Sequence, residues 1–298
     1  MTVFNMLIGL PGSGKSTFAK KLMEYDPQTV YLSSDKIREE LYGDESIQGD
    51  ANKVFRTLHN RVKENLSKGI SVIYDATNVN RKSRAGILGE IRHISGVDKR
   101  AYIVWAPYEE CIKRDLLRSR TVGENVIKKF ILRWETPYFD EGFDAIQVIM
   151  NTQEGFNSYT YANKLLGDMD IPHDNPHHQA DVGKHCQLAM RYAKEHFFHP
   201  MVTFAAMYHD IGKPMTKFFK VGKDGVKEDI AHYYQHDNAG GYLSLGISCN
   251  NDGEKLLLSW LISNHMQPFF NSKYYQGLTG SSIRELLDDL HEADLNAH

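Results

Sequence analysis

The feature that most constrains the fold of this chain is a glycine-rich turn near its start. The run GLPGSGKS at residues 9–16 follows the apolar stretch Val3–Ile8 and precedes the amphipathic stretch Ser16–Glu24. Glycines let consecutive backbone N–H groups curve around an anion without Cβ clashes, and the following helix directs its positive end at the same point. The pattern therefore predicts a strand, a phosphate-binding loop and a helix.

Side chains of this loop have expected roles toward ATP or another NTP. Lys15 would reach the β- and γ-phosphates, and the hydroxyl of Ser16 or Thr17 would bind Mg²⁺. A glycine turn that binds nothing is the alternative, but strand, loop, lysine and serine occur in register. The expected nucleotide contacts are Gly9, Gly12, Ser13, Gly14, Lys15, Ser16 and Thr17.

Short apolar runs alternate with amphipathic stretches throughout the first half. The expected strands are Val3–Ile8, Thr29–Leu32, Ile70–Tyr74, Ala101–Trp105 and Ala145–Ile149, and the expected helices are Ser16–Glu24, Ala51–Lys68, Lys82–Ile94 and Tyr108–Leu117. This alternation predicts an α/β domain with a parallel sheet flanked by helices. Strands without regular polar alternation suit a sheet that is buried on both faces.

The second half is mainly helical. The expected helices are Ala180–Phe197, Met201–Tyr208, Glu254–Asn264 and Ser281–His291, and Phe218–Ile230 could form a small hairpin. A stretch rich in Asn, Gly, Asp and Pro lies between the halves. We therefore expect domains at 1–152 and 176–298, joined by a linker at 153–175.

Two acidic residues follow expected strands of the first half. A carboxylate at Asp35, beyond the second strand, could accept the proton of an attacking hydroxyl, while Arg38 holds an acceptor phosphate. Asp75, after the third strand, would assist Mg²⁺. The alternatives are a helix-capping Asp35 and a turn-capping Asp75.

A basic stretch, KRDLLRSR, covers residues 113–120. Arg114 and Arg118 have the i,i+4 spacing of one helix face and lead into a corner at 121–123. Arginines on a closing lid would neutralise the charge of the transferring phosphoryl group. The alternative is a solvated basic face.

Together, GLPGSGKST, SSDKIR, DATN and KRDLLRSR resemble the kinase domain of phage polynucleotide kinase–phosphatase over residues 1–150. This resemblance implies that Asp35 is the general base for a 5′-hydroxyl and that Arg38 binds the acceptor-side phosphate. It also implies a donor-phosphate contact from the lid, by Arg118 or by Arg120.

Histidine dominates the second half as arginine dominates the first. Twelve of the 14 histidines lie after residue 170, and 11 of the 13 arginines lie before residue 134. Imidazole and carboxylate ligands hold Mn, Fe, Co, Ni, Zn or Mg, and they leave positions for water. The candidate metal ligands are His185, His209, Asp210, His236, His265 and Asp294, with His232 as a competitor of His236. Any one of them alone could be an ordinary core or surface residue.

The ordered series His…His-Asp…His…His…Asp, with the string HDIGK, resembles the HD-domain phosphohydrolase superfamily over residues 176–298. The resemblance implies an all-α helical bundle and one or two bound divalent metals. It assigns His185, His209, Asp210 and Asp294 as ligands, adds His236 and His265 in two-metal members, and places Lys213 near the scissile phosphate. His173, His177, His178 and His199 are expected at the surface. Tyr233, Tyr234, Tyr274 and Tyr275 could stack on bases, although core packing is favoured.

Composition limits the remaining possibilities. Three scattered cysteines, Cys111, Cys186 and Cys249, favour buried thiols in a reducing cytoplasm over disulfides or a zinc pair. No apolar run is long enough to span a membrane, and the start of the chain lacks a secretory signal. The net charge of −3 gives no overall attraction to nucleic acid.

The two resemblances together predict an end-healing enzyme for RNA or DNA. It would combine an NTP-dependent 5′-hydroxyl kinase with a metal-dependent 3′-phosphatase or 2′,3′-cyclic phosphodiesterase, and would supply ends to a ligase. The alternative is a nucleoside or metabolite kinase joined to an HD nucleotide phosphohydrolase, which the acidic net charge favours. A third class, an ATP-switched binding module without catalysis, leaves Asp35 and the ligand series unexplained.

Overall fold

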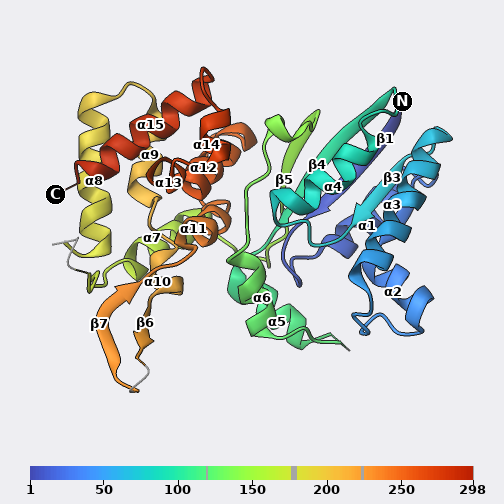
Figure 1. Cartoon of the computed structure of the whole chain (residues 1–298), viewed down its shortest axis with the longest axis horizontal. Coiled ribbons are helices and arrows are strands. Elements are labelled where there is room, and N and C mark those ends of the chain that lie inside the picture. Colours follow the sequence, from blue (N-terminus) through green and yellow to red (C-terminus); the bar gives the residue numbers. More distant parts are fainter. Residues whose placement is uncertain (119, 176–179, 223–224, 298) are drawn as a thin grey trace. The chain divides into compact units, whose positions relative to one another are not determined.

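A computed structural model describes residues 1–118, 120–175, 180–222 and 225–297, and the chain forms two compact units (Figure 1). The N-terminal unit contains Met1–Phe130 and Pro137–Glu154. The C-terminal unit contains Ile131–Thr136 and Gly155–His298. Each unit has its own buried apolar core.

The N-terminal unit is built on a five-stranded parallel sheet, as predicted. Its strands are β1 (Thr2–Ile8), β2 (Val30–Ser33), β3 (Val72–Asp75), β4 (Val97–Trp105) and β5 (Ala145–Met150). They are ordered β2-β3-β1-β4-β5, so β1 lies at the centre, between β3 and β4. Phe4 to Ile8 are all buried because both faces of this central strand are covered.

Helices pack on this sheet as the alternating pattern predicted. They are α1 (Lys15–Tyr25), α2 (Ser34–Tyr42), α3 (Ala51–Ser67), α4 (Arg81–Ile91), α5 (Tyr108–Leu116) and α6 (Glu124–Ile131), followed by a 3₁₀ turn at Phe139–Glu141. Leu7, Ile73 and Tyr102 of the sheet form one apolar cluster with Ala19 of α1. The periodicity did not predict α6, whose eight residues are few for a visible pattern.

The C-terminal unit is mainly helical. Its helices are α7 (Ser158–Asp168), α8 (Val182–His196), α9 (Pro200–Tyr208), α10 (Lys213–Thr216), α11 (His236–Ser244), α12 (Asp252–Asn264), α13 (Gln267–Phe270), α14 (Lys273–Gly277) and α15 (Ser282–Leu295). Helices α8, α9, α12 and α15 pack against one another. The expected all-α bundle is interrupted by an antiparallel hairpin, β6 (Phe218–Val221) and β7 (Lys227–His232), which confirms the possible hairpin at 218–230. Lys223 and Asp224 of its turn lie outside the described residues.

The predicted linker at 153–175 contains a helix. In α7, the side chain of Asn157 accepts a hydrogen bond from the backbone N–H of Thr160 and caps the first turn. Tyr161, Ala162 and Leu165 are buried along one face. The Asn and Gly content of this stretch hid the helix because these residues are also typical of loops.

A short segment of the first half belongs to the C-terminal unit. Trp134 is fully buried, and its indole N–H donates to Thr136 Oγ1 at 3.0 Å. Thr136 Oγ1 lies 2.7 Å from Ser259 Oγ, and the Trp134 ring meets the edge of Tyr242. The chain therefore enters the C-terminal unit at Ile131–Thr136, leaves it, and returns at Gly155. The predicted boundary after residue 152 places this segment in the first domain, whereas it belongs to the C-terminal unit.

The three cysteines are free, as expected. Cys111 and Cys186 are buried core residues, whereas Cys249 is partly exposed. None of the helices in the described part of the chain combines the length and the apolar character that a membrane-spanning segment requires.

Candidate functional site

The phosphate-binding loop follows the end of β1 and continues into α1. Gly12 has a φ of 79°, and a Cβ at this position would lie 2.3 Å from the carbonyl oxygen of Cys111. Only glycine fits this backbone conformation and this close approach. Gly14, also at positive φ, occupies the N-cap of α1, so the free N–H groups of the helix face the loop.

Lys15, the predicted phosphate-binding lysine, folds back over the loop. Its Nζ donates to the carbonyl oxygens of Gly9 and Leu10, both at 2.9 Å. Burial lowers the pKa of Lys15, while the nearby carboxylates of Asp75 and Asp35 oppose that shift. An ammonium held over a ring of backbone N–H groups suits the phosphates of a nucleotide.

Asp75 lies at the end of β3, beside β1, and it is buried. Its Oδ2 accepts hydrogen bonds from Ser16 Oγ at 3.2 Å and from Tyr31 OH at 2.6 Å. Burial and the Asp75 charge raise the pKa of Tyr31, which keeps its hydroxyl protonated as a donor. Ser16 and Asp75, both predicted to assist Mg²⁺, therefore adjoin each other. The described contacts of Asp75 are of this kind and not those of a turn cap. Tyr31 was not predicted.

Asp35 and Arg38 lie on the first turns of α2, directly beyond β2. Ser33, not Asp35, caps this helix, because its side chain accepts from the N–H of Lys36. The capping alternative for Asp35 is therefore wrong. Arg38 Nη1 donates to Asp35 Oδ1 at 2.8 Å, and the Asp35 side chain remains 47% exposed, which leaves it open to an incoming hydroxyl.

Two residues lie beside the loop: Arg114, which was predicted as a lid arginine, and Asn151, which was not predicted. Arg114 of α5 donates to the carbonyl oxygens of Asn151, at 2.9 Å, and Ser13, at 3.5 Å. Asn151 Nδ2 donates to the same Ser13 oxygen at 2.7 Å. Arg114 is thus part of the loop surroundings and not a solvated lid residue. Asn151 directly follows β5, a position that could have identified it because such residues gather at one sheet edge.

The predicted lid begins where α5 ends, at Leu116. Arg118 is exposed beyond the helix, so it does not share the expected helix face with Arg114. Arg120 Nη1 lies 3.7 Å from Glu45 Oε1. The corner that follows is held by the buried carboxylate of Asp115, whose Oδ2 accepts from the N–H groups of Val122 at 3.0 Å and Gly123 at 2.9 Å.

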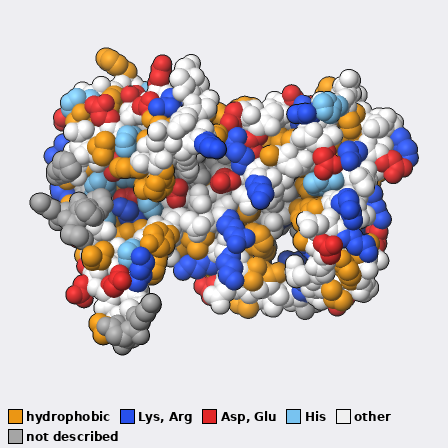
Figure 2. Space-filling view, in the orientation of Figure 1, with side chains coloured by type: hydrophobic (Ala, Val, Ile, Leu, Met, Phe, Trp, Pro, Cys, Tyr) orange, Lys and Arg blue, Asp and Glu red, His pale blue; other side chains and the backbone are white. Residues whose placement is uncertain are grey.

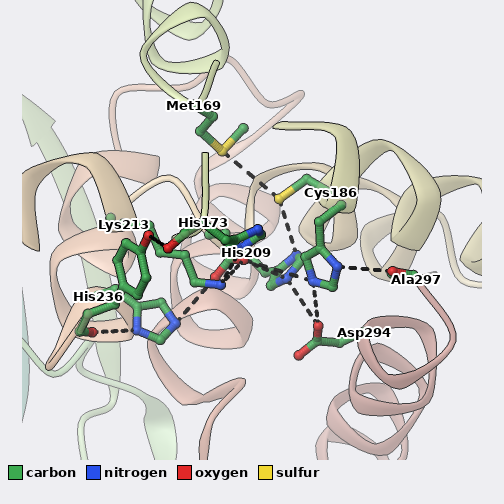
Figure 3. Close-up of polar contacts among 12 residues, drawn as sticks. Met169, His173, Cys186, His209, Lys213, His236, Asp294 and Ala297 are labelled. Atoms are coloured by element: carbon green, nitrogen blue, oxygen red, sulfur yellow. Dashed lines mark hydrogen bonds and ion pairs between the residues drawn. The ribbon is translucent and has the colours of Figure 1, made fainter. Parts of the chain in front are cut away.

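Six predicted metal ligands converge inside the C-terminal unit, and Figure 3 labels three of them, His209, His236 and Asp294. His185 comes from α8, His209 and Asp210 follow α9, and Asp294 comes from α15. His236 begins α11 and His265 follows α12. All six lie in the core formed by these helices. The two groups that could each hold an ion are His185 with His209 and Asp210, and Asp210 with His236 and His265.

Asp210 lies between the two groups of histidines. Its Oδ2 is 3.4 Å from His209 Nε2 and 3.9 Å from His185 Nε2. Its Oδ1 is 3.3 Å from His236 Nε2 and 3.9 Å from His265 Nε2. Asp294 Oδ1 completes the first group, at 2.8 Å from His185 Nε2 and 3.4 Å from His209 Nε2.

Backbone carbonyl groups orient the four imidazoles. The Nδ1 atoms of His209, His236 and His265 lie 2.7–2.8 Å from the carbonyl oxygens of Ala206, Tyr233 and Ile262, each three residues earlier. His185 Nδ1 lies 3.2 Å from the carbonyl oxygen of Ala297. Because a carbonyl only accepts, each Nδ1 carries a proton, and Nε2 is the ring atom that faces the cluster.

The arrangement fits a bound divalent metal. His209 Nε2 is a buried atom with no hydrogen-bond partner among the described residues. His236 Nε2 and His265 Nε2 lie 3.1 Å apart, so two lone pairs would face each other without a cation or a proton between them. Burial and the neighbouring histidines lower the pKa of His265 to about 3, which favours the cation over the proton at neutral pH.

Close packing accounts for the glycine of the string HDIGK, Gly212. A Cβ on this residue would lie 2.0 Å from the carbonyl oxygen of His236 and 2.7 Å from the N atom of Gly240. The glycine therefore allows α11 to pack directly on the turn that carries His209 and Asp210. This contact brings His236 to within reach of Asp210.

Lys213 is buried beside the cluster, and three groups hold its ammonium. Nζ lies 2.7 Å from Asp210 Oδ2, 3.1 Å from His173 Nε2 and 5.4 Å from the centroid of the Tyr233 ring. Burial and the charge of Lys213 lower the pKa of His173 to about 4, so His173 is neutral at neutral pH and accepts from the ammonium.

The other histidines are placed as follows. The expectation of a surface His173 was wrong, because only 2% of it is exposed. The ring of His173 contacts the buried ammonium of Lys213. No local sequence pattern predicts this contact. His199 is exposed, as expected, while His177 and His178 lie outside the described residues. His232 lies outside the cluster and 3.3 Å from Glu228 Oε2, so His236 is the one near Asp210.

A match to a known family lies in the first half of the chain. Residues 5–137 match the family model of an AAA domain. The chain is 28% identical to L-seryl-tRNA(Sec) kinase of Methanococcus maripaludis over 171 residues, which are 54% of this chain and 64% of that relative. It thus spans less than two thirds of the length of this curated relative.

Two solved structures resemble the chain more distantly. A chain of the Pnkp1/Rnl/Hen1 RNA repair complex is 23% identical, with a TM-score of 0.41, and the match covers 44% of this chain and 43% of that one. A fungal RNA kinase is 19% identical, with a TM-score of 0.40, and the match covers 54% and 41%. The family match, the parallel sheet and the glycine-rich loop show that the N-terminal unit is a kinase-like P-loop domain. The relation of the C-terminal unit to the HD superfamily stays a prediction.

Proposed function

We propose that this chain is a bifunctional nucleic-acid end-healing enzyme. Its N-terminal unit would transfer the γ-phosphate of ATP or another NTP to a 5′-hydroxyl end. Its C-terminal unit would hydrolyse a 3′-phosphate or a 2′,3′-cyclic phosphate. The observation that carries this proposal is that one chain holds both a phosphate-binding loop facing Asp35 and a buried Asp210 shared by two groups of histidines.

In the kinase reaction, Asp35 would take the proton of the attacking hydroxyl. A bond would form between that oxygen and the γ-phosphorus, and the bond to the β-γ bridging oxygen would break, releasing the nucleoside diphosphate. Arg38, whose Nη1 is 2.8 Å from Asp35, would bind the acceptor phosphate. Lys15 and the helix N-terminus would stabilise the charge on the donor phosphates, with Mg²⁺ between Ser16 and Asp75.

In the hydrolytic unit, His185, His209, Asp210 and Asp294 would hold one divalent ion, and Asp210, His236 and His265 a second. Such ions polarise the phosphate and lower the pKa of water. Lys213 would bind a phosphate oxygen with its buried ammonium. The products of the two units, a 5′-phosphate and a 3′-hydroxyl, are the ends that a ligase requires, so we infer a functional link to an RNA or DNA ligase.

The test uses the full-length protein with labelled ATP and short RNA and DNA strands that carry 5′-hydroxyl, 3′-phosphate or 2′,3′-cyclic phosphate ends. Mg²⁺, Mn²⁺, Co²⁺ and Ni²⁺ are supplied in turn. We expect label on the 5′ end and release of the 3′ phosphate. Asp35→Asn should remove the first activity alone, and the double variant His209→Ala, Asp210→Ala the second alone. Absence of both activities with every metal and strand would refute the proposal.

A second candidate is a nucleoside or metabolite kinase joined to an HD nucleotide phosphohydrolase. The net charge of −3 favours it, because proteins that bind a nucleic-acid backbone usually carry excess positive charge. Adding nucleosides and mononucleotides to the same assay separates the two. Transfer to a free nucleoside at a kcat/KM above that of the oligonucleotide would favour the second candidate.

A further inference from the structure

The β6–β7 hairpin exposes several large apolar side chains. It extends away from the helices of the C-terminal unit (Figure 1), and hydrophobic, basic and acidic side chains lie along it (Figure 2). Phe218 is 39% exposed, Ile230 45%, Tyr234 58% and Val221 65%. Contiguous exposed apolar residues of this kind mark a binding surface more often than a structural one.

Three rings share one face of the hairpin. Phe218 pairs directly with His232 in the β ladder, and Tyr234 is two residues further along the same strand direction. The ring centroids lie 5.5 Å apart for Phe218–His232, 5.4 Å for Phe218–Tyr234 and 5.6 Å for His232–Tyr234. The favoured expectation of core packing is therefore wrong for Tyr234, which presents its ring to solvent. We call Phe218, His232 and Tyr234 the ring cluster.

Lysines accompany these rings. Lys220 Nζ lies 5.7 Å from the centroid of Tyr234, and on the opposite face Lys227 Nζ lies 4.0 Å from the centroid of Phe219. Residues 217–222 and 225–234 contain three lysines and two acids, Glu228 and Asp229. Lys217 is paired with Asp174 at 2.8 Å, and Glu228 Oε2 lies 3.3 Å from His232 Nε2. The lysine beside the ring cluster complements a phosphodiester group.

The ring cluster is followed in the chain by residues of the candidate metal centre. Tyr233 lies in sequence between His232 and Tyr234, and its hydroxyl donates to the carbonyl oxygen of His173, the residue that contacts Lys213. Two residues later, His236 enters the metal cluster. The end of the hairpin that carries Tyr234 therefore leads directly into the segment that carries His236.

We propose that the ring cluster and Lys220 bind the single-stranded 3′ end of a nucleic acid. Bases would stack on Tyr234 and Phe218, Lys220 would contact a backbone phosphate, and the terminal phosphate would reach Lys213 and the metal cluster. Aromatic rings beside lysines bind single strands without sequence preference, because every base has a π face. This inference rests on the proposed hydrolytic function for the position of the end, but not for the binding itself.

The experiment compares Tyr234→Ala with Tyr234→Phe, which keeps the ring, and with Tyr234→Leu, which keeps apolar bulk alone. Phe198→Ala, an exposed aromatic of the same unit outside the hairpin, is the matched control. Binding of a fluorescent ten-nucleotide single strand is measured by anisotropy at fixed salt. The KM for a 3′-phosphorylated strand is measured beside that for a mononucleotide 3′-phosphate. Circular dichroism and melting check that each variant folds.

We expect Tyr234→Ala and Tyr234→Leu to weaken strand binding about tenfold, with Tyr234→Phe and Phe198→Ala unchanged. Lys220→Ala should weaken binding and reduce its salt dependence. The KM should rise for the strand and not for the mononucleotide. Unchanged binding in Tyr234→Ala, or a monomer–dimer shift in its place, would overturn the inference and indicate a protein-binding surface. If the wild type binds the strand through Tyr234 but hydrolyses neither substrate, the hydrolytic function fails while the binding surface stands.

Discussion

The two candidate centres are encoded in different ways. In the N-terminal unit, the loop, Lys15 and Ser16 are neighbours in the chain, and the backbone itself provides most of the anion-binding groups. In the C-terminal unit, six side chains between His185 and Asp294 meet only when five helices pack together. The first centre depends on local conformation and the second on the core.

This difference affects how each centre responds to change. In the loop, the positive φ of Gly12 and its close approach to Cys111 exclude any other residue at this position. The effect of a substitution there is therefore decided by the immediate surroundings. In the metal cluster, one carboxylate, Asp210, serves two groups of histidines, so a single change reaches both. We therefore expect a substitution in one centre to leave the activity of the other centre unchanged. Within the C-terminal unit, a single substitution should affect more of the ligands than a single substitution in the loop does.

The largest effect is expected from Asp210→Ala. The change removes the only carboxylate shared by the two groups among the described residues, so bound metal should fall to near zero and hydrolysis below detection. Metal content by mass spectrometry and phosphate release measure this. Kinase activity serves as the internal control. Full metal content in the variant would show that Asp210 is not a ligand.

Next in size is Asp35→Asn. Asparagine keeps the shape and loses the basic carboxylate, so phosphoryl transfer should fall by about 10²–10⁴-fold. Initial rates with saturating ATP measure it, and Glu39→Gln, an exposed residue of the same helix, is the control. An unchanged rate would assign the base elsewhere. Metal content should not change, which separates the two centres.

An intermediate effect concerns pH and His173. Its pKa is lowered by burial and by Lys213 to about 4, against an ordinary value of 6.5. Below pH 6.5 the unfolded chain binds a proton that the folded chain does not, so the free energy of unfolding should decrease as pH falls to about 4, by up to ~3 kcal/mol. Below that, this contribution stays constant.

His173→Gln should flatten this part of the pH profile, although the variant is itself less stable. Denaturant unfolding of the C-terminal unit at several pH values between 4 and 7 measures it, with the exposed His199→Gln as the control. If the free energy of unfolding changes with pH equally in wild type and His173→Gln, then His173 is not the group that takes up a proton on unfolding.

The smallest expected effect is that of Asp115→Asn. Its carboxylate holds the N–H groups of Val122 and Gly123, and an amide would turn a donor toward one of them. The corner that follows Arg118 and Arg120 should loosen, and kcat should fall about tenfold. Steady-state kinetics measure this, with Glu109→Gln of the same helix as the control. A larger loss than for Asp35→Asn would show that the lid, not the base, dominates.

The sheet of the first unit could be predicted from the sequence because its strands are apolar runs between turn residues, and because residues 9–16 identify the loop. Asp35, Asp75 and Asn151 share the carboxyl edge of that sheet. Only Asp35 and Asp75 were predicted, because the site residues predicted at strand ends were charged side chains and Asn151 is uncharged. Tyr31 reaches the site from β2, which sequence spacing does not reveal, and Arg114, predicted on a lid, contacts the loop from α5.

The metal cluster was predicted from the order of its histidines and acids together with the local string HDIGK. What could not be predicted is the set of contacts that the helix packing creates. His173 precedes the unit's first ligand by 12 residues and reaches Lys213 through the fold. The segment Ile131–Thr136 was missed for a similar reason, because its Trp134 and Thr136 contact Tyr242 and Ser259, which lie far along the chain.

The segment Ile131–Thr136 has a practical consequence. Since it supplies Trp134 to the C-terminal core, cutting the gene once, after residue 152 or 175, does not yield two intact halves. A fragment that starts at Gly155 lacks a large buried indole, and its hydrophobic interior is left with a void. Separating the activities therefore calls for point substitutions in the intact polypeptide, or for a tethered peptide that restores the missing tryptophan.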